Sequence, residues 1–136
     1  MTDAAVAAGA GAFTTDWNAT HIYNPRWPPH AKFHDPQTMV SAVQLGALSL
    51  WQLWGRRPAD RSALRWGALF AGTYWFSQAP AIGVPGTALV DPEFGSNRPG
   101  FGRLPVNQLT STAAAITPLL ASGYVLESRR LRRVGL

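Results

Sequence analysis

The segment Pro36–Trp54 reads PQTMVSAVQLGALSLWQLW and contains no charged side chain. As an α-helix it would extend over about 28 Å, close to the roughly 30 Å hydrocarbon core of a bilayer. Trp51 and Trp54 stand at its end, where tryptophan is favoured at a membrane interface. The segment therefore predicts a transmembrane helix, with Asp35 as its N-cap and Pro36 at the first helical position.

Two further uncharged stretches, 66–82 and 109–126, alternate with polar segments. We expect spans at 66–82 and 106–127, the latter kinked by Pro118. The apolar run 4–13 is too short to cross a bilayer, so it is a frayed tail, a short re-entrant helix or a reduced fourth span. The predicted fold is an all-α transmembrane bundle in one domain, 1–136. A soluble bundle of buried helices is the alternative, because the mean hydropathy is only -0.04.

The polar segments complete the expected organisation. They are a short N-terminal segment (1–15), an outer loop (16–35), a cytoplasmic loop (55–65), a second outer loop (83–105) and a basic cytoplasmic tail (128–136), separated by the spans 36–54, 66–82 and 106–127.

The arginines suggest a topology. The charged fraction is 14%, against about 25% for typical soluble domains. Eight of the twelve basic residues lie in 55–65 and 128–136, which the positive-inside rule assigns to the cytoplasm together with the C-terminus. The proline-rich segments 16–35 and 83–105 then share the outer side. The Ala, Gly and Arg bias is typical of a high-GC bacterial genome, so we expect the bacterial cytoplasmic membrane.

The composition excludes several kinds of site. The chain has no cysteine, which excludes disulfides, thiolate metal sites and cysteine nucleophiles. Although the net charge is +5, the basic residues form no patch interleaved with aromatic readers, so nucleic acid is not an expected partner.

All three histidines, His21, His30 and His34, lie in the first outer loop. On a helix, His30 and His34 would share one face, as paired zinc ligands do, but Pro36 argues against a helix through 30–34. Hydrogen bonds that fix the loop are the favoured role, and we predict no metal and no cofactor.

Asp91 and Glu93 are the acids of the second outer loop. A carboxylate beside a partly desolvated histidine can act as a general acid/base pair, whereas the alternative is that Asp91 only starts a turn. The candidate catalytic residues are His21, His30, His34, Asp91 and Glu93. Residues expected near the outer mouth of the bundle are candidates for substrate binding: Asn18, Trp27, Tyr74 and Gln78. For the polar residues within the spans, interhelical hydrogen bonding is the favoured alternative.

The strings DWNATHIYNPRWPPHAKFHDPQTM (16–39) and PGTALVDPEF (85–94) resemble the signature of a family of small, uncharacterised four-helix membrane proteins of bacteria and fungi. The resemblance covers roughly 16–96 and implies a helical fold and a membrane location. It supplies no catalytic residues. An acetyltransferase label carried by some members finds no support here, because the chain has no phosphate-binding cradle. The family's first span would correspond to the reduced run 4–13.

The sequence leaves two alternative functions, an enzyme and a non-catalytic protein. One is an enzyme that performs isomerase- or cyclase-type acid–base chemistry on a lipophilic small molecule at the outer side of the bilayer. The other is a non-catalytic subunit or assembly factor of a larger membrane complex. The expected partners are the lipid bilayer, the lipophilic molecule, and either further copies of the chain or a larger complex.

Overall fold

The computed structural model describes residues 1–56, 60–97, 100–101 and 104–136. Its elements are α1 (Thr2–Asp16), α2 (Pro29–Leu50), a π-helical turn (Trp51–Gly55), α3 (Arg61–Ala81), a 3-10 helix (Pro92–Asn97), α4 (Gln108–Ser111), a second π-helical turn (Thr112–Ile116) and α5 (Thr117–Arg133). Two strands, β1 (Gly100–Phe101) and β2 (Leu104–Pro105), pair antiparallel. The predicted helical bundle is confirmed.

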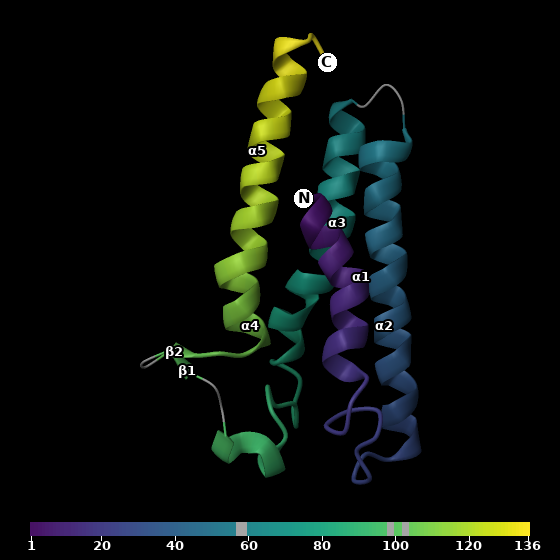
Figure 1. Cartoon of the computed structure of the whole chain (residues 1–136), viewed down its shortest axis with the longest axis vertical. Coiled ribbons are helices and arrows are strands. Elements are labelled where there is room, and N and C mark those ends of the chain that lie inside the picture. Colours follow the sequence, from purple (N-terminus) through teal and green to yellow (C-terminus); the bar gives the residue numbers. More distant parts are fainter. Residues whose placement is uncertain (57–59, 98–99, 102–103) are drawn as a thin grey trace.

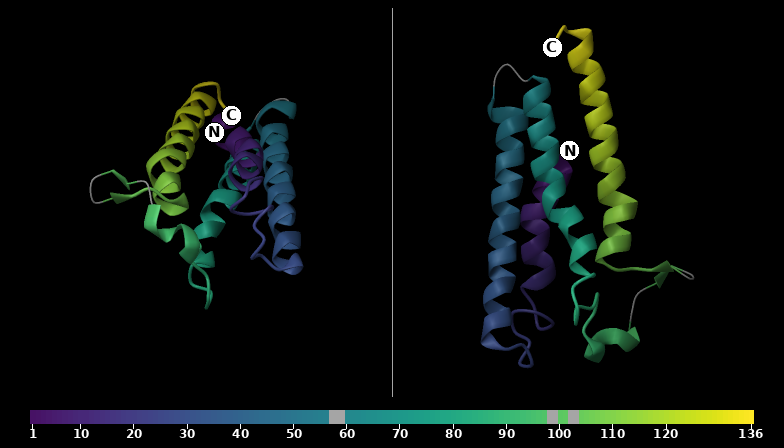
Figure 2. Two further views of the ribbon diagram at one scale, coloured as in Figure 1. Left: turned by 60° about the horizontal axis from the view of Figure 1, so that its bottom comes forward. Right: turned by 180° about the vertical axis from the view of Figure 1, so that it is seen from behind.

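Figure 1 shows α2, α3 and the continuous α4–α5 stretch running lengthwise, with α1 beside α2 in the lower half. The start of α3 and the end of α5, which carry the arginine clusters, lie at the upper end. The loops that follow α1 and α3 lie at the lower end, and the two views of Figure 2 give the same arrangement. The two proline-rich segments therefore share one end of the bundle, opposite the two arginine clusters.

Small residues bring α1 and α2 together. Ala5 and Ala12 of α1 and Ala42 of α2 are fully buried. A Cβ built on Gly46 of α2 would lie 2.6 Å from the carbonyl oxygen of Ala5, so only glycine permits this approach of the two backbones. Such contacts between small residues are the usual way in which helices pack where no large apolar side chain separates them.

Polar side chains connect α3 to the other helices. Ser49 Oγ of α2 donates a hydrogen bond of 2.8 Å to the Gly67 carbonyl, and Trp75 Nε1 donates one of 3.1 Å to the Ala4 carbonyl. A hydrogen bond between buried groups on two helices contributes about 1 kcal/mol. These bonds fix α3 against both α1 and α2.

The start of α2 differs from the prediction. The helix begins at Pro29, with Pro28 as the N-cap residue, and Pro36 lies inside it. Asp35 is therefore not an N-cap; its side chain projects from the second turn of the helix. Proline fits the first position of a helix without loss of a hydrogen bond, and Pro29 takes that position seven residues earlier than expected.

The helices nearest the two ends of the chain also differ in detail from the expected ones. Residues 2–16 form a complete helix, about 22 Å long, that packs into the bundle. Near Pro118, the structure has a π-helical turn over Thr112–Ile116, and the helix continues through the proline. A π-turn shifts the hydrogen-bond register, which accommodates a residue that lacks an N–H.

In the described part of the chain, one helical stretch is long and apolar enough to cross a membrane. It is Gln108–Arg133, and 11% of its most apolar window is buried inside the protein.

Candidate functional site

Hydrogen bonds join the two proline-rich loops. Asn24 Nδ2 donates to Glu93 Oε1 at 3.1 Å, and the guanidinium of Arg26 donates to Glu93 Oε2 at 2.7 Å. Trp27 Nε1 donates to Asp91 Oδ2 at 3.0 Å. We call these five residues the loop clasp. The clasp brings three of the predicted site residues, Trp27, Asp91 and Glu93, to one place.

Local structure prepares both halves of the clasp. Asn24 is 2% exposed, and its Oδ1 accepts the backbone N–H of Arg26 at 2.9 Å, so the first loop is folded around this amide. In the second loop, the Thr87 N–H donates to the Val84 carbonyl across a tight turn, and Gly86 has φ +85°. Glycine adopts that left-handed conformation without a steric penalty. The turn directs the chain toward Asp91.

The clasp holds Glu93 in its ionised form. Hydrogen bonds from Arg26 and Asn24, together with the charge of Arg26, keep the pKa of Glu93 below its ordinary value of 4.5. A carboxylate that is ionised and engaged through both oxygens is a poor general acid or base. The geometry therefore gives Glu93 a structural role.

A second group of polar side chains lies between α1, α2 and α3. Asp16, the last residue of α1, is 8% exposed, and Asp35 comes from the second turn of α2. Within the described residues, Oδ1 of Asp16 and Oδ2 of Asp35 are buried without a hydrogen-bond partner. His21 Nε2 lies 3.8 Å from Asp16 Oδ1. We call Asp16, His21, Asp35 and the adjacent Tyr74 the carboxylate cluster.

The hydrogen bonds of Thr20 fix the orientation of His21. Thr20 Oγ1 donates to Asn18 Oδ1 at 2.6 Å, so its only hydrogen is engaged there. The contact of 2.8 Å between Thr20 Oγ1 and His21 Nδ1 then requires Nδ1–H as the donor. A neutral His21 therefore presents the lone pair of Nε2 toward Asp16. Because two lone pairs cannot bond each other, a proton or a ligand donor belongs between them.

The two carboxylates of the cluster influence one another. Burial raises the pKa of Asp35 above its ordinary value of 3.8, the charge of Asp16 raises it further, and His21 opposes both effects. Asp16 also carries a negative charge at the C-terminal end of α1, where the helix dipole is unfavourable to anions. Two neighbouring carboxylates that each have one buried oxygen without a hydrogen-bond partner are unusual in a purely structural setting, and such groups are enriched at acid–base sites.

Tyr74 forms one wall of the carboxylate cluster. Its ring packs against Ala12, Met39 and Ala42, and its hydroxyl interacts electrostatically with Asp16 and Asp35. Tyr74, a candidate for substrate binding from the sequence, therefore lies beside Asp16 and Asp35.

The remaining predicted residues lie elsewhere. His30 and His34 do lie on a helix, contrary to the expectation from Pro36, and their Nε2 atoms are 3.1 Å apart on the exposed side of α2. No group of three or more His, Asp or Glu in the described residues is arranged to hold a metal. Gln78 Oε1 accepts from Thr112 Oγ1 at 3.4 Å, a contact between α3 and the π-turn before α5.

The sequence pattern did not predict the roles of three residues that build this end of the protein: Asp16, Asn24 and Asp35. Asp35 was predicted to be a helix cap, and neither Asp16 nor Asn24 was among the predicted site residues. A weak signal was present, because Asp16 precedes His21 by five residues in a chain with only seven acids. What no pattern revealed is that α2 begins early enough to carry Asp35 inward.

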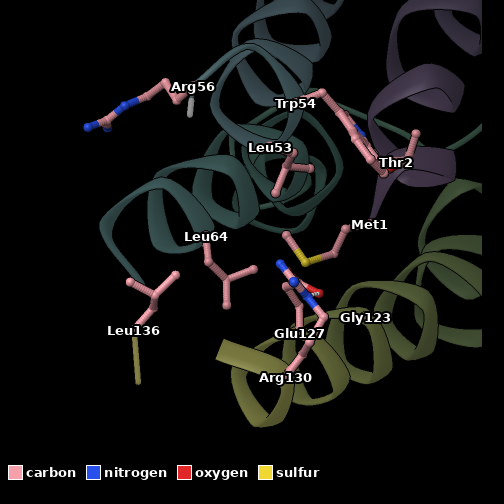
Figure 3. A pocket seen from close by; sticks show the side chains of 10 residues that line it. All are labelled: Met1, Thr2, Leu53, Trp54, Arg56, Leu64, Gly123, Glu127, Arg130 and Leu136. Carbon is pink, nitrogen blue, oxygen red and sulfur yellow. Dashed lines mark hydrogen bonds and ion pairs between the residues drawn. The ribbon is translucent and has the colours of Figure 1, made fainter. Parts of the chain in front are cut away.

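A cavity of about 640 Å³ lies at the other end of the bundle, between α1, α3 and α5. Figure 3 shows Met1, Leu53 and Leu64 pointing into it, while Arg56 points away. Glu127 and Arg130 lie along its α5 side and pair with each other, with Oε1 2.8 Å from Nε. None of the predicted site residues lines this cavity.

Comparison with known proteins identifies the family. No curated protein and no solved structure matches the chain. Residues 1–135 match the profile described as a family of unknown function (DUF6640), which agrees with the uncharacterised family expected from the sequence. Because the match covers nearly the whole chain, this protein belongs to that family.

Proposed function

We propose that this protein is a small membrane-spanning helical bundle whose carboxylate cluster performs acid–base chemistry, of the isomerase or cyclase type, on a lipophilic small molecule. The first support for a membrane location is the exposure of large apolar side chains: Leu69, Phe76 and Leu126 are exposed to 54%, 49% and 65%. In water such a surface would promote aggregation, whereas lipid chains cover it without penalty.

The distribution of charge supports the same location. The arginine clusters lie at one end of the bundle and the proline-rich loops at the other (Figure 1). Under the positive-inside rule, the arginine end and the C-terminus are cytoplasmic and the loop clasp is on the outer side. In this arrangement the spans are residues 36–54, 66–82 and 106–127, which belong to α2 and the turn after it, to α3, and to the α4–α5 stretch. Asp35, at the start of α2, lies outside the first span, and α1 is a shorter fourth helix.

One observation carries the functional part of the proposal. Asp16 and Asp35 come from different helices, interact electrostatically, and each have one buried oxygen without a hydrogen-bond partner. His21 lies beside them, with its Nε2 facing Asp16. Unsatisfied buried carboxylates are expensive to maintain unless they exchange protons or bind a ligand.

The roles follow from the electrostatics. Asp35, the carboxyl with the raised pKa, is the proton donor, and His21 Nε2 with Asp16 is the acceptor. The acceptor removes a proton from one atom of the substrate and Asp35 delivers one to another atom. Transfer of a proton from the acceptor back to Asp35 then restores the site. The product is an isomer of the substrate, and no cofactor is consumed.

The loop clasp gives Asp91, Glu93 and Trp27 a supporting role in this proposal. By joining the loops, these residues hold the loop end of α3 and its Tyr74 beside α1 and α2. His30 and His34, on the exposed side of α2, are outside the reacting group.

The test compares lipid extracts from membranes of cells that express the protein with those that express Asp16→Asn, Asp35→Asn or His21→Gln. An isomerase or cyclase converts one lipophilic species into another of equal mass but different chromatographic retention. We expect that change with the unaltered protein and with the control His30→Gln, and no change with the three variants. The folded state of each variant is checked by circular dichroism in detergent.

Two outcomes would contradict the proposal. The first is that the extracts are identical with and without the protein. The second is that the protein is recovered from its native membranes in fixed stoichiometry with other subunits and that the three variants assemble normally, which would identify a non-catalytic subunit.

A further inference from the structure

A second, smaller cavity lies between α3 and α5 at the arginine end of the bundle. Its volume is about 260 Å³. Residues spaced three and four apart on α3 meet residues spaced four apart on α5, so each helix contributes one face. The lining residues are Arg61, Leu64, Arg65, Tyr124, Ser128 and Arg132.

Among the described residues that line this cavity, three are arginines and none carries a side-chain carboxylate. Two other arginines of the chain, Arg26 and Arg130, are paired with glutamates. In the described ranges neither Arg65 nor Arg132 has an acidic partner within 4 Å. The nearby carboxylate of Asp60 accepts the Ala63 N–H at 2.7 Å as the N-cap of α3.

Three guanidinium groups line this one small cavity, and an anion bound between them would reduce their mutual repulsion. Arg61 Nε already donates to a main-chain oxygen of Leu136 at 2.9 Å, which leaves the guanidiniums of Arg65 and Arg132 as the principal donors. The planar fork of arginine suits the oxygens of a phosphate, and the hydroxyls of Ser128 and Tyr124 add further donors. We propose that this cavity binds a phosphate group, supplied by the headgroup of an anionic lipid.

The surroundings favour a lipid as the source of the phosphate. Leu64 lines both this cavity and the cavity of about 640 Å³ beside it, so an apolar space adjoins the anion site (Figure 3). On α3, Trp66 and Leu69 are exposed to 48% and 54% and continue the apolar surface away from the arginines. Basic pockets between membrane helices on the cytoplasmic side commonly hold anionic headgroups. The lipid assignment rests on the membrane location proposed above.

The experiment uses the full chain in micelles of a neutral detergent at physiological ionic strength. The unfolding temperature is measured against rising concentrations of dioctanoyl phosphatidylglycerol, of dioctanoyl phosphatidylcholine and of inorganic phosphate. We expect a saturable increase with phosphatidylglycerol and none with phosphatidylcholine. Arg65→Gln and Arg132→Gln should each weaken the apparent affinity about fivefold. Both arginines are exposed, so the variants should fold normally, which the unfolding temperature without lipid verifies.

The matched control is Arg133→Gln, which removes the same charge from the same turn of α5 but does not line either cavity. A markedly smaller loss of affinity in this variant supports the site. A saturable, Arg132-dependent response to inorganic phosphate alone would support the phosphate site and identify free phosphate as its source. Equal responses to the two lipids, or equal losses in Arg132→Gln and Arg133→Gln, would overturn the proposal.

The same titration shows whether the anion site is independent of the carboxylate cluster. Asp35→Asn should bind phosphatidylglycerol like the unaltered protein, because Asp35 lies at the other end of the bundle. Failure of anion binding would therefore leave the carboxylate cluster unaffected.

Discussion

Replacing Asn24 by alanine should open the contact between the two proline-rich loops. The side chain of Asn24 makes three hydrogen bonds, to the Thr20 carbonyl at 3.2 Å, to Glu93 Oε1 at 3.1 Å and from the Arg26 N–H at 2.9 Å. A hydrogen bond contributes about 1 kcal/mol to stability, and the residue is 2% exposed. Water from the nearby surface can replace part of this loss, so we expect the Asn24→Ala variant to lose about 2–3 kcal/mol.

Two measurements check this prediction. Denaturant unfolding in mixed micelles, followed by tryptophan fluorescence, gives the free energy of unfolding. Hydrogen exchange at the Phe94 amide, which donates to the Asp91 carbonyl at 3.0 Å, reports whether the second loop opens locally. Asn24→Asp is the informative companion, because it keeps the acceptor for Arg26 but places a second carboxylate beside Glu93. Its loss of stability should therefore be largest at neutral pH and smaller when the solution is acidified.

Two results together would contradict a stabilising role for Asn24. They are an Asn24→Ala protein whose free energy of unfolding is within about 0.5 kcal/mol of the unaltered protein, and unchanged exchange at the Phe94 amide. The contact between the loops would then contribute nothing to the fold.

Three further predictions follow from the packing and the electrostatics. Gly46→Ala should destabilise the protein by about 1–3 kcal/mol because the new Cβ meets the carbonyl oxygen of Ala5. Gly11→Ala should be neutral or stabilising, because the nearest atom to its Cβ is a ring carbon of Trp75 at 3.8 Å; the free energies of unfolding in micelles are compared. Trp27→Phe should lose about 1 kcal/mol in the same assay because it deletes one hydrogen-bond donor but keeps an aromatic ring. Asp35→Asn should be more stable than the unaltered protein at neutral pH. Because the pKa of Asp35 is raised in the folded state, the folded protein holds an extra proton between pH 3.8 and that pKa, and its stability falls as the pH rises through this window. The difference between the two proteins should vanish below pH 3.8, and a thermal-unfolding series that shows a constant difference across pH would contradict the prediction.

The sequence predicted the helical parts of the fold well because charge is absent from long stretches of it. The uncharged blocks correspond to the C-terminal part of α2 with the turn after it, to most of α3, and to the stretch from α4 into α5. The arginine clusters lie together at one end of the bundle. The predicted start of α2 was wrong because either Pro29 or Pro36 can occupy the first position of a helix. Local sequence does not distinguish the two; the packing of α2 against α1 does.

The candidate site was predicted only in part. The second loop, which carries Asp91 and Glu93, does contact the first loop. The partners of the two acids are Trp27, Asn24 and Arg26, and not histidines. Contacts between residues more than sixty positions apart depend on how the helices align, which periodicity does not encode. Asp35 was hidden for the same reason, since its burial follows from the early start of α2.

The most direct test of the carboxylate cluster is a titration of Asp35 by carbon NMR in detergent, with aspartate labelled at the carboxyl carbon and Asp35→Asn used to assign the signal. We predict that Asp35 titrates above its ordinary value of 3.8, that Asp16→Asn lowers this pKa by removing a neighbouring negative charge, and that His21→Gln raises it by removing the opposing influence of the histidine. An Asp35 that titrates at its ordinary value, and does so unchanged in both variants, would contradict the existence of a coupled acid–base site.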